Sequence, residues 1–535
     1  MNNKYALLSL TDKSNLAILI SSLVNHNFKL IGTTSTAKTI KDLGYECQLV
    51  EEITNFPEIL EGRVKTLQPQ IHGGILADLS KENQLADLEK HQINPISVVV
   101  CNLYPFEEVL EKETKRHQEV VTSKNSEAIE KSEQQLASTM VENIDIGGVT
   151  LIRAASKNYQ HVTILCDPQD YNTYIEHLNN NQVSNDYRKS LAMKGFIHTA
   201  NYDSMIANYF METEAKQTET LSQLLISAPL KQKLRYGENP HQKAYYFEKN
   251  KTTSYSMSSS QVIQGKELSY NNLLDIDAAY NAIYEFDQPC ALAFKHNTPC
   301  GIGFAEDILK AYLKCYEVDP VSIFGGVVIF NQPVDLQLAQ KLNEIFLEII
   351  IAPDFSKEAL QEFSNKKNLR VIKGNFDKKQ YHGEQIRSIN GGYLLQDSLS
   401  TSLAFDVVTT TGIDNKVKEQ LLNLYKVVKS VKSNAVIYGQ GQEVLGISGG
   451  MVSRIDACEF GMQKVIKHPA YQNNEPLLLA SDAYFPFNDI VELAVQNKIK
   501  YIIQPGGSIN DEKLIAACNE KGIAMAFTGK RYFKH

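Results

Sequence analysis

The chain has 535 residues, of which 43% are apolar and 22% charged, and its formal net charge at neutral pH is -8. This length exceeds what a single hydrophobic core supports, so two or more domains are expected. The acidic balance argues against a general nucleic-acid-binding protein, and no apolar run is long enough to span a membrane.

The N-terminal apolar stretch, residues 5–10, is too short for a secretory signal peptide. The eight cysteines are scattered singly and form no CxxC pair. This arrangement supports neither a disulfide framework nor a zinc site. We therefore expect a cytoplasmic protein with reduced thiols and no metal requirement for catalysis.

Residues 1–50 alternate between strand-like and helix-like segments. Strands are expected at residues 5–10, 28–32 and 45–50, with helices at 15–24 and 36–43 between them. A βαβαβ pattern of this kind predicts a parallel sheet.

Hydroxyl-rich turns lead from the first two strands into their helices. Hydroxyl groups and free backbone amides at a helix N-terminus bind anions, so these turns are candidates for a phosphate site. Plain N-capping is the alternative, but it needs only one such residue. The turns carry Ser9, Thr11, Asp12 and Lys13, then Thr33, Thr34, Ser35 and Thr36.

Arg63 and Lys65 lie two residues apart on a segment expected to be extended, so their side chains point the same way. Neighbouring glycines such as Gly62 allow a ligand to approach the backbone. An anion site and a basic surface turn explain this segment equally well. The strand expected at residues 96–101 then ends close to Tyr104.

Residues 107–142 are polar and rich in Glu, Lys and Ser, and we interpret them as a helical or partly disordered surface insertion. Asp145 and Lys157, which follow it, are candidate partners. A long helical pattern covers residues 185–211, and residues 212–228 have the composition of a linker. The predicted domains are therefore residues 1–211 and 229–535.

In the second half, a short buried strand at residues 291–294 ends directly on Lys295 and His296. Residues 297–301 are predicted to form a turn that continues neither a helix nor a strand. In α/β sheets, ligands bind at strand ends of this kind. Further strand-like and helix-like segments alternate along this half, so it is also predicted to be α/β, and no internal repeat is evident.

Several common sites are excluded by their missing motifs. The chain has no P-loop, no complete dinucleotide-binding glycine fingerprint and no serine-hydrolase elbow. Pro299 and Cys300 match the start of a zinc-deaminase motif, but Gly303 stands where the second cysteine is required. Zinc-deaminase chemistry is thereby excluded, although a related fold is not.

Taken together, the motifs of the chain resemble those of one family closely and in order from Ala6 to His535. They are RVKTLQP, IHGGIL, CNLYPF, NIDIGGVTLIRAASKN, LRYGENPHQ, AFKHNTPCG, VKSNAV, SDAYFPF, PGGS and RYFKH. The chain is similar to the bifunctional purine-biosynthesis family that joins IMP cyclohydrolase to aminoimidazole carboxamide ribonucleotide (AICAR) formyltransferase.

The resemblance implies an N-terminal domain with a methylglyoxal-synthase-like fold that cyclises formyl-AICAR to IMP with loss of water. Its catalytic positions correspond here to Lys65, Tyr104, Asp145 and Lys157. Its substrate and phosphate positions correspond to Ser9, Lys13, Thr33, Ser35, Thr36, Arg63 and Thr66. Two positions depart from the family pattern, because Thr34-Ser35 replaces Gly-Gly and Gln68 replaces His.

The resemblance further implies a C-terminal domain that transfers formyl from 10-formyltetrahydrofolate to AICAR. This domain is expected to be a duplicated cytidine-deaminase-like α/β fold without zinc. Its catalytic positions correspond to Lys295, His296 and Asn434. Its substrate positions correspond to Arg235, Tyr236, Asn272, Arg531 and His535, and its folate-side positions to Phe485, Asp489 and Ser508.

The family implies a homodimer whose ligands are AICAR, formyl-AICAR, IMP and folate. Two other hypotheses stay open from the sequence. One is a formyltransferase whose cyclohydrolase domain is weakened by the departures at Thr34-Ser35 and Gln68. The other is a nucleotide-binding regulator without catalysis, which would be expected to have lost Lys295 or His296.

Overall fold

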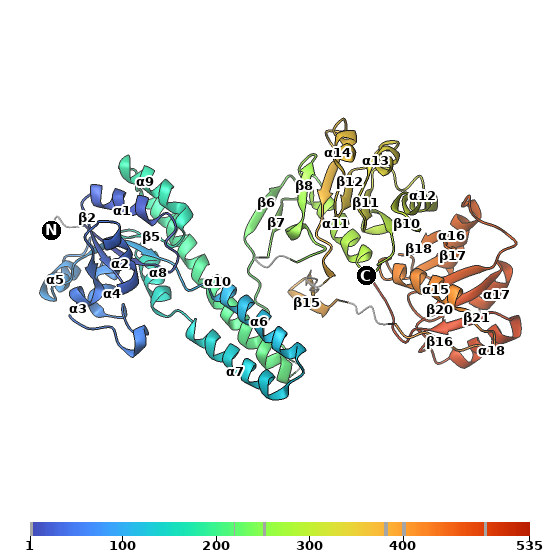
Figure 1. Cartoon of the computed structure of the whole chain (residues 1–535), viewed down its shortest axis with the longest axis horizontal. Helices are drawn as coiled ribbons and strands as arrows, with labels where there is room; N and C mark the ends of the chain where they lie inside the picture. The colour runs from blue at the N-terminus through green and yellow to red at the C-terminus, as the bar shows by residue number, and fades with distance from the viewer. Residues whose placement is uncertain (1–3, 219, 250–252, 379–383, 399–402, 486–488) are drawn as a thin grey trace. The chain divides into compact units, whose positions relative to one another are not determined.

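The structure is a computed structural model that describes residues 4–218, 220–249, 253–378, 384–398, 403–485 and 489–535. The chain forms two compact units, Met1–Ser227 and Ala228–His535, which we call the N-terminal and C-terminal units (Figure 1). Both units contain β-sheets covered by helices. Among the described residues, no helix is both long enough and apolar enough to cross a membrane.

The N-terminal unit is built on one parallel sheet with the strand order β3-β2-β1-β4-β5. The predicted parallel sheet is therefore confirmed. The third strand is much shorter than expected, because Val50 already begins a helix. The strands are β1 (Lys4–Ser9), β2 (Phe28–Gly32), β3 (Gln48–Leu49), β4 (Ile96–Cys101) and β5 (Thr163–Leu165).

The helices of this unit pack around the sheet, with α1 against α9 and α8 against α4 and α10. Their apolar faces and the buried strands form one continuous core. The helices are α1 (Leu16–Asn25), α2 (Thr34–Asp42), α3 (Val50–Thr54), α4 (Pro69–Leu76), α5 (Glu82–Lys90), α6 (Phe106–Thr122), α7 (Ser126–Glu142), α8 (Gly147–Lys157), α9 (Tyr171–Asn179) and α10 (Asn185–Thr218).

The strand order reverses between β1 and β4. The chain moves outward from β1 through β2 to β3, and then returns to the other side of β1 for β4 and β5. Such a reversal leaves a crevice outside the carboxyl ends of the two adjacent strands, where open α/β sheets bind ligands.

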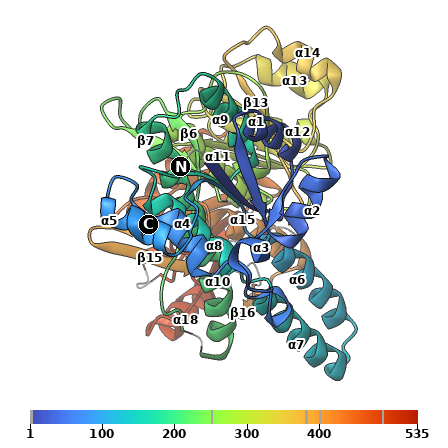
Figure 2. The ribbon, with the colours of Figure 1, turned by 90° about the vertical axis from the view of Figure 1, so that its left-hand side faces the viewer.

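The polar insertion is helical and forms a hairpin of α6 and α7 that projects from the sheet (Figure 2). Its base is anchored by Phe106, which is buried and makes edge-to-face contacts with Tyr202 and Tyr209 of α10 at ring-centroid distances of 6.2 and 6.1 Å. The side chain of Asn125 caps the start of α7.

The helix α10 continues to Thr218, beyond the expected start of a linker at residue 212. The expectation of a linker over the whole of residues 212–228 is therefore wrong for its first part. The segment 212–218 contains Glu, Ala, Lys and Gln, which are good helix formers, and no glycine or proline that would end the helix.

The C-terminal unit contains two six-stranded sheets with the orders β10-β9-β11-β12-β13-β8 and β18-β17-β19-β20-β21-β16. Strand directions also agree, because each sheet has an antiparallel hairpin, three parallel strands and an antiparallel last strand. The strands are β8 (Gln261–Gln264), β9 (Cys290–Lys295), β10 (Thr298–Phe304), β11 (Val327–Phe330), β12 (Ile349–Ala352), β13 (Arg370–Lys373), β16 (Asp406–Val407), β17 (Val436–Gln440), β18 (Glu443–Ser448), β19 (Leu477–Ser481), β20 (Ile499–Gln504) and β21 (Ala524–Phe527).

The helices repeat as well, so the unit consists of two halves with the same order of elements. The residue pattern itself showed no internal repeat, although the family resemblance implied a duplicated fold. The first half has α11 (Tyr270–Ile283), α12 (Ile308–Val318), α13 (Leu336–Asn343) and α14 (Lys357–Phe363), and the second has α15 (Asn415–Val428), α16 (Arg454–Lys467), α17 (Asp489–Gln496) and α18 (Asp511–Lys521). Two small hairpins complete the unit, β6 (Leu230–Leu234) with β7 (Ala244–Phe247) and β14 (Glu384–Ile389) with β15 (Gly392–Asp397).

Glycines in β10 allow α12 to lie very close to this edge strand. A Cβ atom on Gly303 would stand 2.0 Å from the carbonyl oxygen of Ala311, and one on Gly301 would stand 2.2 Å from that of Cys315. Both neighbouring atoms belong to the backbone of α12, so they cannot move aside as a flexible side chain would.

We predict that Gly303→Ala lowers the free energy of unfolding by about 1–3 kcal/mol, because the added methyl group overpacks the β10–α12 contact. Urea unfolding followed by circular dichroism measures this change. Gly412→Ala is the matched control, since a Cβ there meets no atom within 4 Å. Equal stability of the two variants would contradict the packing described for β10.

Candidate active sites

In the N-terminal unit, a cavity of about 660 Å³ lies at the carboxyl ends of β1, β2 and β4, where the strand order reverses. It brings together nine of the residues expected in the cyclohydrolase site. They are Ser9, Lys13, Thr33, Ser35, Arg63, Lys65, Thr66, Tyr104 and Asp145.

One side of the cavity has the features of an anion site. The N-terminus of α2 follows Thr33, whose side chain makes no capping hydrogen bond to the first turn. The ammonium group of Lys13 donates to Ser35 Oγ at 2.8 Å, across the two strand-to-helix turns. First-turn amides, hydroxyls and a lysine therefore face the same part of the cavity.

Asn102, which sequence reasoning left without a role, shapes the first of these turns. Its side-chain oxygen accepts hydrogen bonds from the backbone amides of Thr11 and Asp12 at 2.7 and 3.1 Å. Its amide group donates to the carbonyl of Asp12 at 2.7 Å. An asparagine directly after a buried strand was the available signal, but its contact 90 residues away could not be read from the sequence.

Thr36 is fully buried and does not line the cavity. Its hydroxyl accepts from the backbone amide of Leu10 at 3.0 Å and thereby holds the turn after β1 against α2. The hydroxyl of Thr36 therefore supports the turn and is not among the groups that line the cavity.

The departure at Thr34-Ser35 does not fill the cavity. Only Ser35 lines it, whereas the exposed Thr34 donates a hydrogen bond from Oγ1 to Glu58 Oε2 at 3.1 Å. The other departure, Gln68, precedes α4 and is its N-cap residue. Gln68 is not among the residues that line the cavity.

The carboxyl group of Asp145 also lines the cavity and lies just before α8. It accepts hydrogen bonds from the backbone amides of Gly148, at 2.7 Å, and Tyr104. Burial raises the pKa of Asp145 above its usual value, while these hydrogen bonds and the nearby charge of Lys65 act in the opposite direction. The arrangement places a carboxyl group of raised pKa beside a lysine and a tyrosine, as acid–base chemistry requires.

Lys157 does not line this cavity. It is exposed at the last position of α8, whereas Gly147 at the first position lines the cavity. A rise of about 1.5 Å per residue separates the two ends of this helix by about 15 Å.

In the C-terminal unit, Lys295 ends β9, and His296 and Asn297 form a two-residue turn into β10. The φ angles of His296 and Asn297 are 55° and 60°, which is the pattern of a type I′ hairpin turn. The predicted turn over residues 297–301 is therefore wrong in extent, because residues 298–301 belong to β10. Pro299 is tolerated there because β10 is an edge strand.

Asp275 of α11, missed by sequence reasoning, holds this turn. Its carboxylate accepts hydrogen bonds from the backbone amides of Asn297, at 2.6 Å, and His296. Lys295 is held separately, because its ammonium group donates to the carbonyl of Phe324 at 2.8 Å. The imidazole of His296 is exposed, so it is accessible to a ligand.

Polar residues connect this turn to the expected substrate positions. Asn272 donates to Glu348 Oε2 at 2.9 Å, and the same oxygen lies 3.7 Å from the guanidinium of Arg370. The positive charge of Arg235 contributes to a lower pKa of Arg370, and the negative charge of Glu348 contributes to a raised pKa of Asp275. A chain of charges through Glu348 and Arg370 therefore runs from Asp275, which holds the turn, to Arg235. The guanidinium of Arg235 lies over the ring of Tyr236, 4.8 Å from its centroid.

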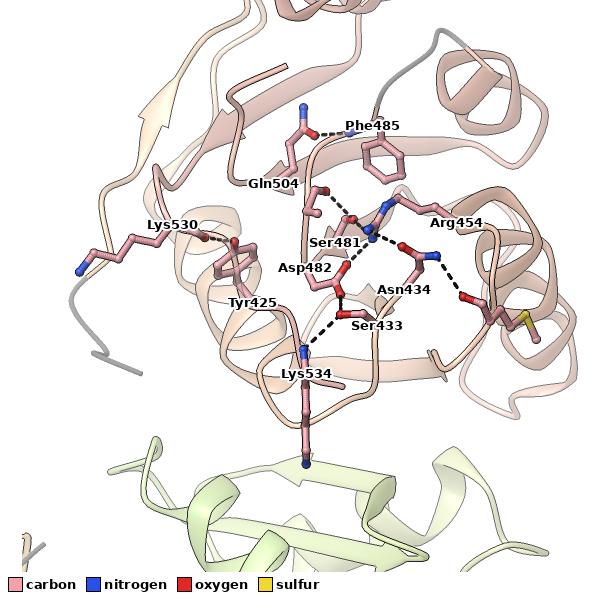
Figure 3. A network of polar contacts seen from close by, with 12 residues as sticks. Tyr425, Ser433, Asn434, Arg454, Ser481, Asp482, Phe485, Gln504, Lys530 and Lys534 are labelled. Carbon is pink, nitrogen blue, oxygen red and sulfur yellow. Dashed lines mark hydrogen bonds and ion pairs between the residues drawn. The ribbon is translucent and has the colours of Figure 1, made fainter. Parts of the chain in front are cut away.

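Asn434 lies in a second polar network, shown in Figure 3. Its side-chain oxygen accepts from Arg454 Nη2 at 2.7 Å, and its amide group donates to the carbonyl of Met451 at 3.0 Å. Arg454 also donates to Ser481 Oγ at 2.9 Å and forms an ion pair with the fully buried Asp482. These contacts fix the orientation of the Asn434 amide.

The C-terminal tail is tied to the same network. The backbone amide of Tyr532 donates to the carbonyl of Asp482 at 3.0 Å, and Ser433 exchanges hydrogen bonds with the backbone of Lys534. Arg531 and His535 are exposed beside the ring of Phe533, at 4.4 and 5.7 Å from its centroid. The network therefore orders the segment that carries both expected substrate residues.

The three expected folate-side residues have different surroundings. Phe485 is buried in the core, and its backbone amide donates to Gln504 at 2.8 Å. Asp489 is exposed at the start of α17, and Ser508 lies in a turn closed by Asp511. Residues 486–488, within the SDAYFPF motif and directly after it, lie outside the described residues.

Comparison with known proteins identifies the family to which the chain belongs. The family model described as AICARFT/IMPCHase bienzyme matches residues 155–464, and a model of the MGS-like domain matches residues 15–122. The chain is 42% identical over 534 residues to the bifunctional purine biosynthesis protein PurH of Halalkalibacterium halodurans, covering 99% of both chains. It is 43% identical to PurH of Aquifex aeolicus over 99% of this chain and 100% of that one. The chain therefore belongs to the AICARFT/IMPCHase bienzyme family and catalyses the last two steps of purine biosynthesis, formyl transfer and cyclohydrolysis.

Proposed function

We propose that the N-terminal unit closes the ring of formyl-AICAR in the cavity between β1 and β4, and that the C-terminal unit transfers the formyl group at the β9–β10 turn. The cavity supports the first assignment because it combines groups that suit an anion with acid–base groups. Two contacts support the second, because Asp275 fixes the turn that carries the imidazole of His296 and the carbonyl of Phe324 holds the ammonium group of Lys295 beside it.

In ring closure, the carboxamide nitrogen of formyl-AICAR attacks its formyl carbon, and water is lost. The step requires positioning and stabilisation of a developing oxyanion more than a strong base. The ammonium group of Lys65 supplies the charge for that oxyanion. Asp145 and Tyr104 move the protons, and a raised pKa suits Asp145 to this exchange.

The substrate phosphate lies at the N-terminus of α2, where Lys13 and Ser35 meet, with Ser9 and Thr33 beside it. Arg63 and Thr66 bind the rest of the substrate. Thr36 supports the turn after β1 through its hydroxyl, and Lys157 lies at the end of α8, outside the residues that line this cavity.

In formyl transfer, the 5-amino group of AICAR attacks the formyl carbon of 10-formyltetrahydrofolate, and the bond from that carbon to N10 then breaks to release tetrahydrofolate. This amine is a poor nucleophile, because its lone pair is delocalised into the ring and the carboxamide, and it must lose a proton as the bond forms. His296 accepts that proton, and Lys295 stabilises the tetrahedral oxyanion. Asn434 orients the formyl oxygen, since its amide group has a second hydrogen beyond the one donated to Met451.

The remaining positions bind the two substrates of formyl transfer. The AICAR side consists of Arg235, Tyr236, Asn272, Arg531 and His535. The folate side consists of Phe485, Asp489 and Ser508.

We further propose that the C-terminal unit is a duplicated cytidine-deaminase-like fold without zinc, which the matching order and direction of its two sheets support. The working assembly is proposed to be a homodimer in the cytoplasm. The two catalytic domains are proposed to be residues 1–211 and 229–535.

We predict that His296→Ala lowers the rate of formyl transfer by about 10²–10⁴-fold, because the general base is lost. Cyclisation of supplied formyl-AICAR by the same variant stays at the wild-type rate. Both rates are measured spectrophotometrically on the full chain. A wild-type rate of formyl transfer would remove His296 from the mechanism, and loss of both activities would contradict the separation of the sites.

Lys65→Ala is expected to have the opposite effect. Cyclisation falls by about 10²–10³-fold, because the oxyanion loses its positive partner, while formyl transfer continues and formyl-AICAR accumulates. Chromatography of the products separates formyl-AICAR from IMP. Lys41→Ala, an exposed lysine on α2, is the control, and normal cyclisation by Lys65→Ala would refute the assignment of the oxyanion.

A further inference from the structure

We infer that Glu58 is a positioning residue for Lys65, and that the hydroxyl group of Thr34 holds Glu58 in place. This inference rests on the proposed role of Lys65 in ring closure. Glu58 Oε1 lies 3.1 Å from Lys65 Nζ, and Glu58 Oε2 accepts the hydrogen bond of Thr34 at 3.1 Å. One carboxylate therefore joins the lysine to the N-terminus of α2.

The backbone brings Glu58 and Lys65 together. Ile59 and Val64 form an isolated antiparallel bridge, in which each backbone amide donates to the carbonyl of the other residue at 3.3 and 3.4 Å. Glu58 and Lys65 are the next residues outward on the two sides of this bridge. Facing positions of an antiparallel pair place their side chains within reach of each other.

The segment between them turns through left-handed backbone conformations. Leu60, Glu61 and Gly62 have φ angles of 54°, 54° and 90°. A Cβ atom on Gly62 would lie 2.5 Å from Glu58 Oε1 and 2.7 Å from Lys65 Cε. The absent side chain of Gly62 thus leaves the space in which the carboxylate and the lysine stem meet. Strained turns of this kind are found where a functional group must be held.

The ion pair is suited to positioning rather than to stability. The side chains of Glu58 and Lys65 are each 32% exposed, and pairs this accessible to water add little to folding free energy. A lysine has a long flexible stem, however, and a catalytic charge acts only when it is held close to its target. Glu58 restricts the ammonium group to one region at the edge of the cavity.

Thr34 gives this chain a second contact to Glu58. A glycine at this position, as in the family pattern, has no hydroxyl to donate. The hydroxyl of Thr34 holds the carboxylate oxygen that does not face Lys65, so it limits rotation of the carboxylate. The departure at residue 34 therefore supports ring closure instead of weakening it.

Steady-state cyclisation of supplied formyl-AICAR by the full chain tests this inference. Glu58→Gln keeps the shape but removes the charge, so kcat is expected to fall about 10–100-fold, with KM changed by less than about threefold. Thr34→Ala is expected to lower kcat about 2–5-fold, whereas Thr34→Ser, which keeps the hydroxyl, retains the wild-type value. Glu51→Gln, an exposed carboxylate on α3, is the matched control.

A double variant separates positioning from a general structural effect. If Glu58 acts through Lys65, Glu58→Gln lowers kcat in the wild type but causes no further loss in a Lys65→Ala background. A wild-type kcat for Glu58→Gln, a change confined to KM, or an equal loss in both backgrounds would overturn the inference. Normal cyclisation by Lys65→Ala alone would instead overturn the proposed function.

Discussion

The geometry of the proposed formyl-transfer site depends on the contact between the Asp275 carboxylate and the backbone amides of the β9–β10 turn. This contact holds His296 in a left-handed conformation that a residue with a Cβ adopts at a cost of about 1–2 kcal/mol. The matching hairpin of the second half, β17–β18, turns at Gly441 with a φ of 57°, where Gln440 and glycine replace Lys295 and His296. The repeated topology thus supplies two similar hairpins, of which one carries a cation and an imidazole.

In the N-terminal unit, the candidate functional groups are held in position by a different set of contacts. These groups come from the ends of three parallel strands, from the start of α8 and from the segment before α4 that carries Arg63 and Lys65. The charged groups among them have partners. Asp145 accepts backbone amides, Lys13 contacts Ser35, and Lys65 is paired with Glu58. Arg63 forms an ion pair with Glu142 at the end of the insertion hairpin. Such partners hold flexible side chains at the edge of the cavity before substrate arrives.

Much of this arrangement could be predicted from local sequence. The alternation of strand-like and helix-like segments predicted the parallel sheet. The ends of the predicted strands indicated candidate site residues, namely Ser9, Lys13, Tyr104 and Lys295. Long-range partners could not be predicted, because nothing near Asp275 or Glu58 in the sequence shows which turn each one meets. The turn at residues 297–301 was misjudged because Pro299 and Gly301 resemble turn residues, although an edge strand accepts both. The family motif predicted that Lys157 lies in the same site as Asp145. In the structure, the length of α8 places Lys157 at the end of the helix that is remote from the cavity.

We propose that each unit carries out one complete reaction, so formyl-AICAR made by one site can be released and used by the other. Mixing two defective variants, His296→Ala and Lys65→Ala, with AICAR and 10-formyltetrahydrofolate tests this separation. Neither variant alone should form IMP at an appreciable rate. The mixture should form IMP, since Lys65→Ala releases formyl-AICAR and His296→Ala cyclises it. A mixture that forms no IMP would show that the two sites are not separable as described.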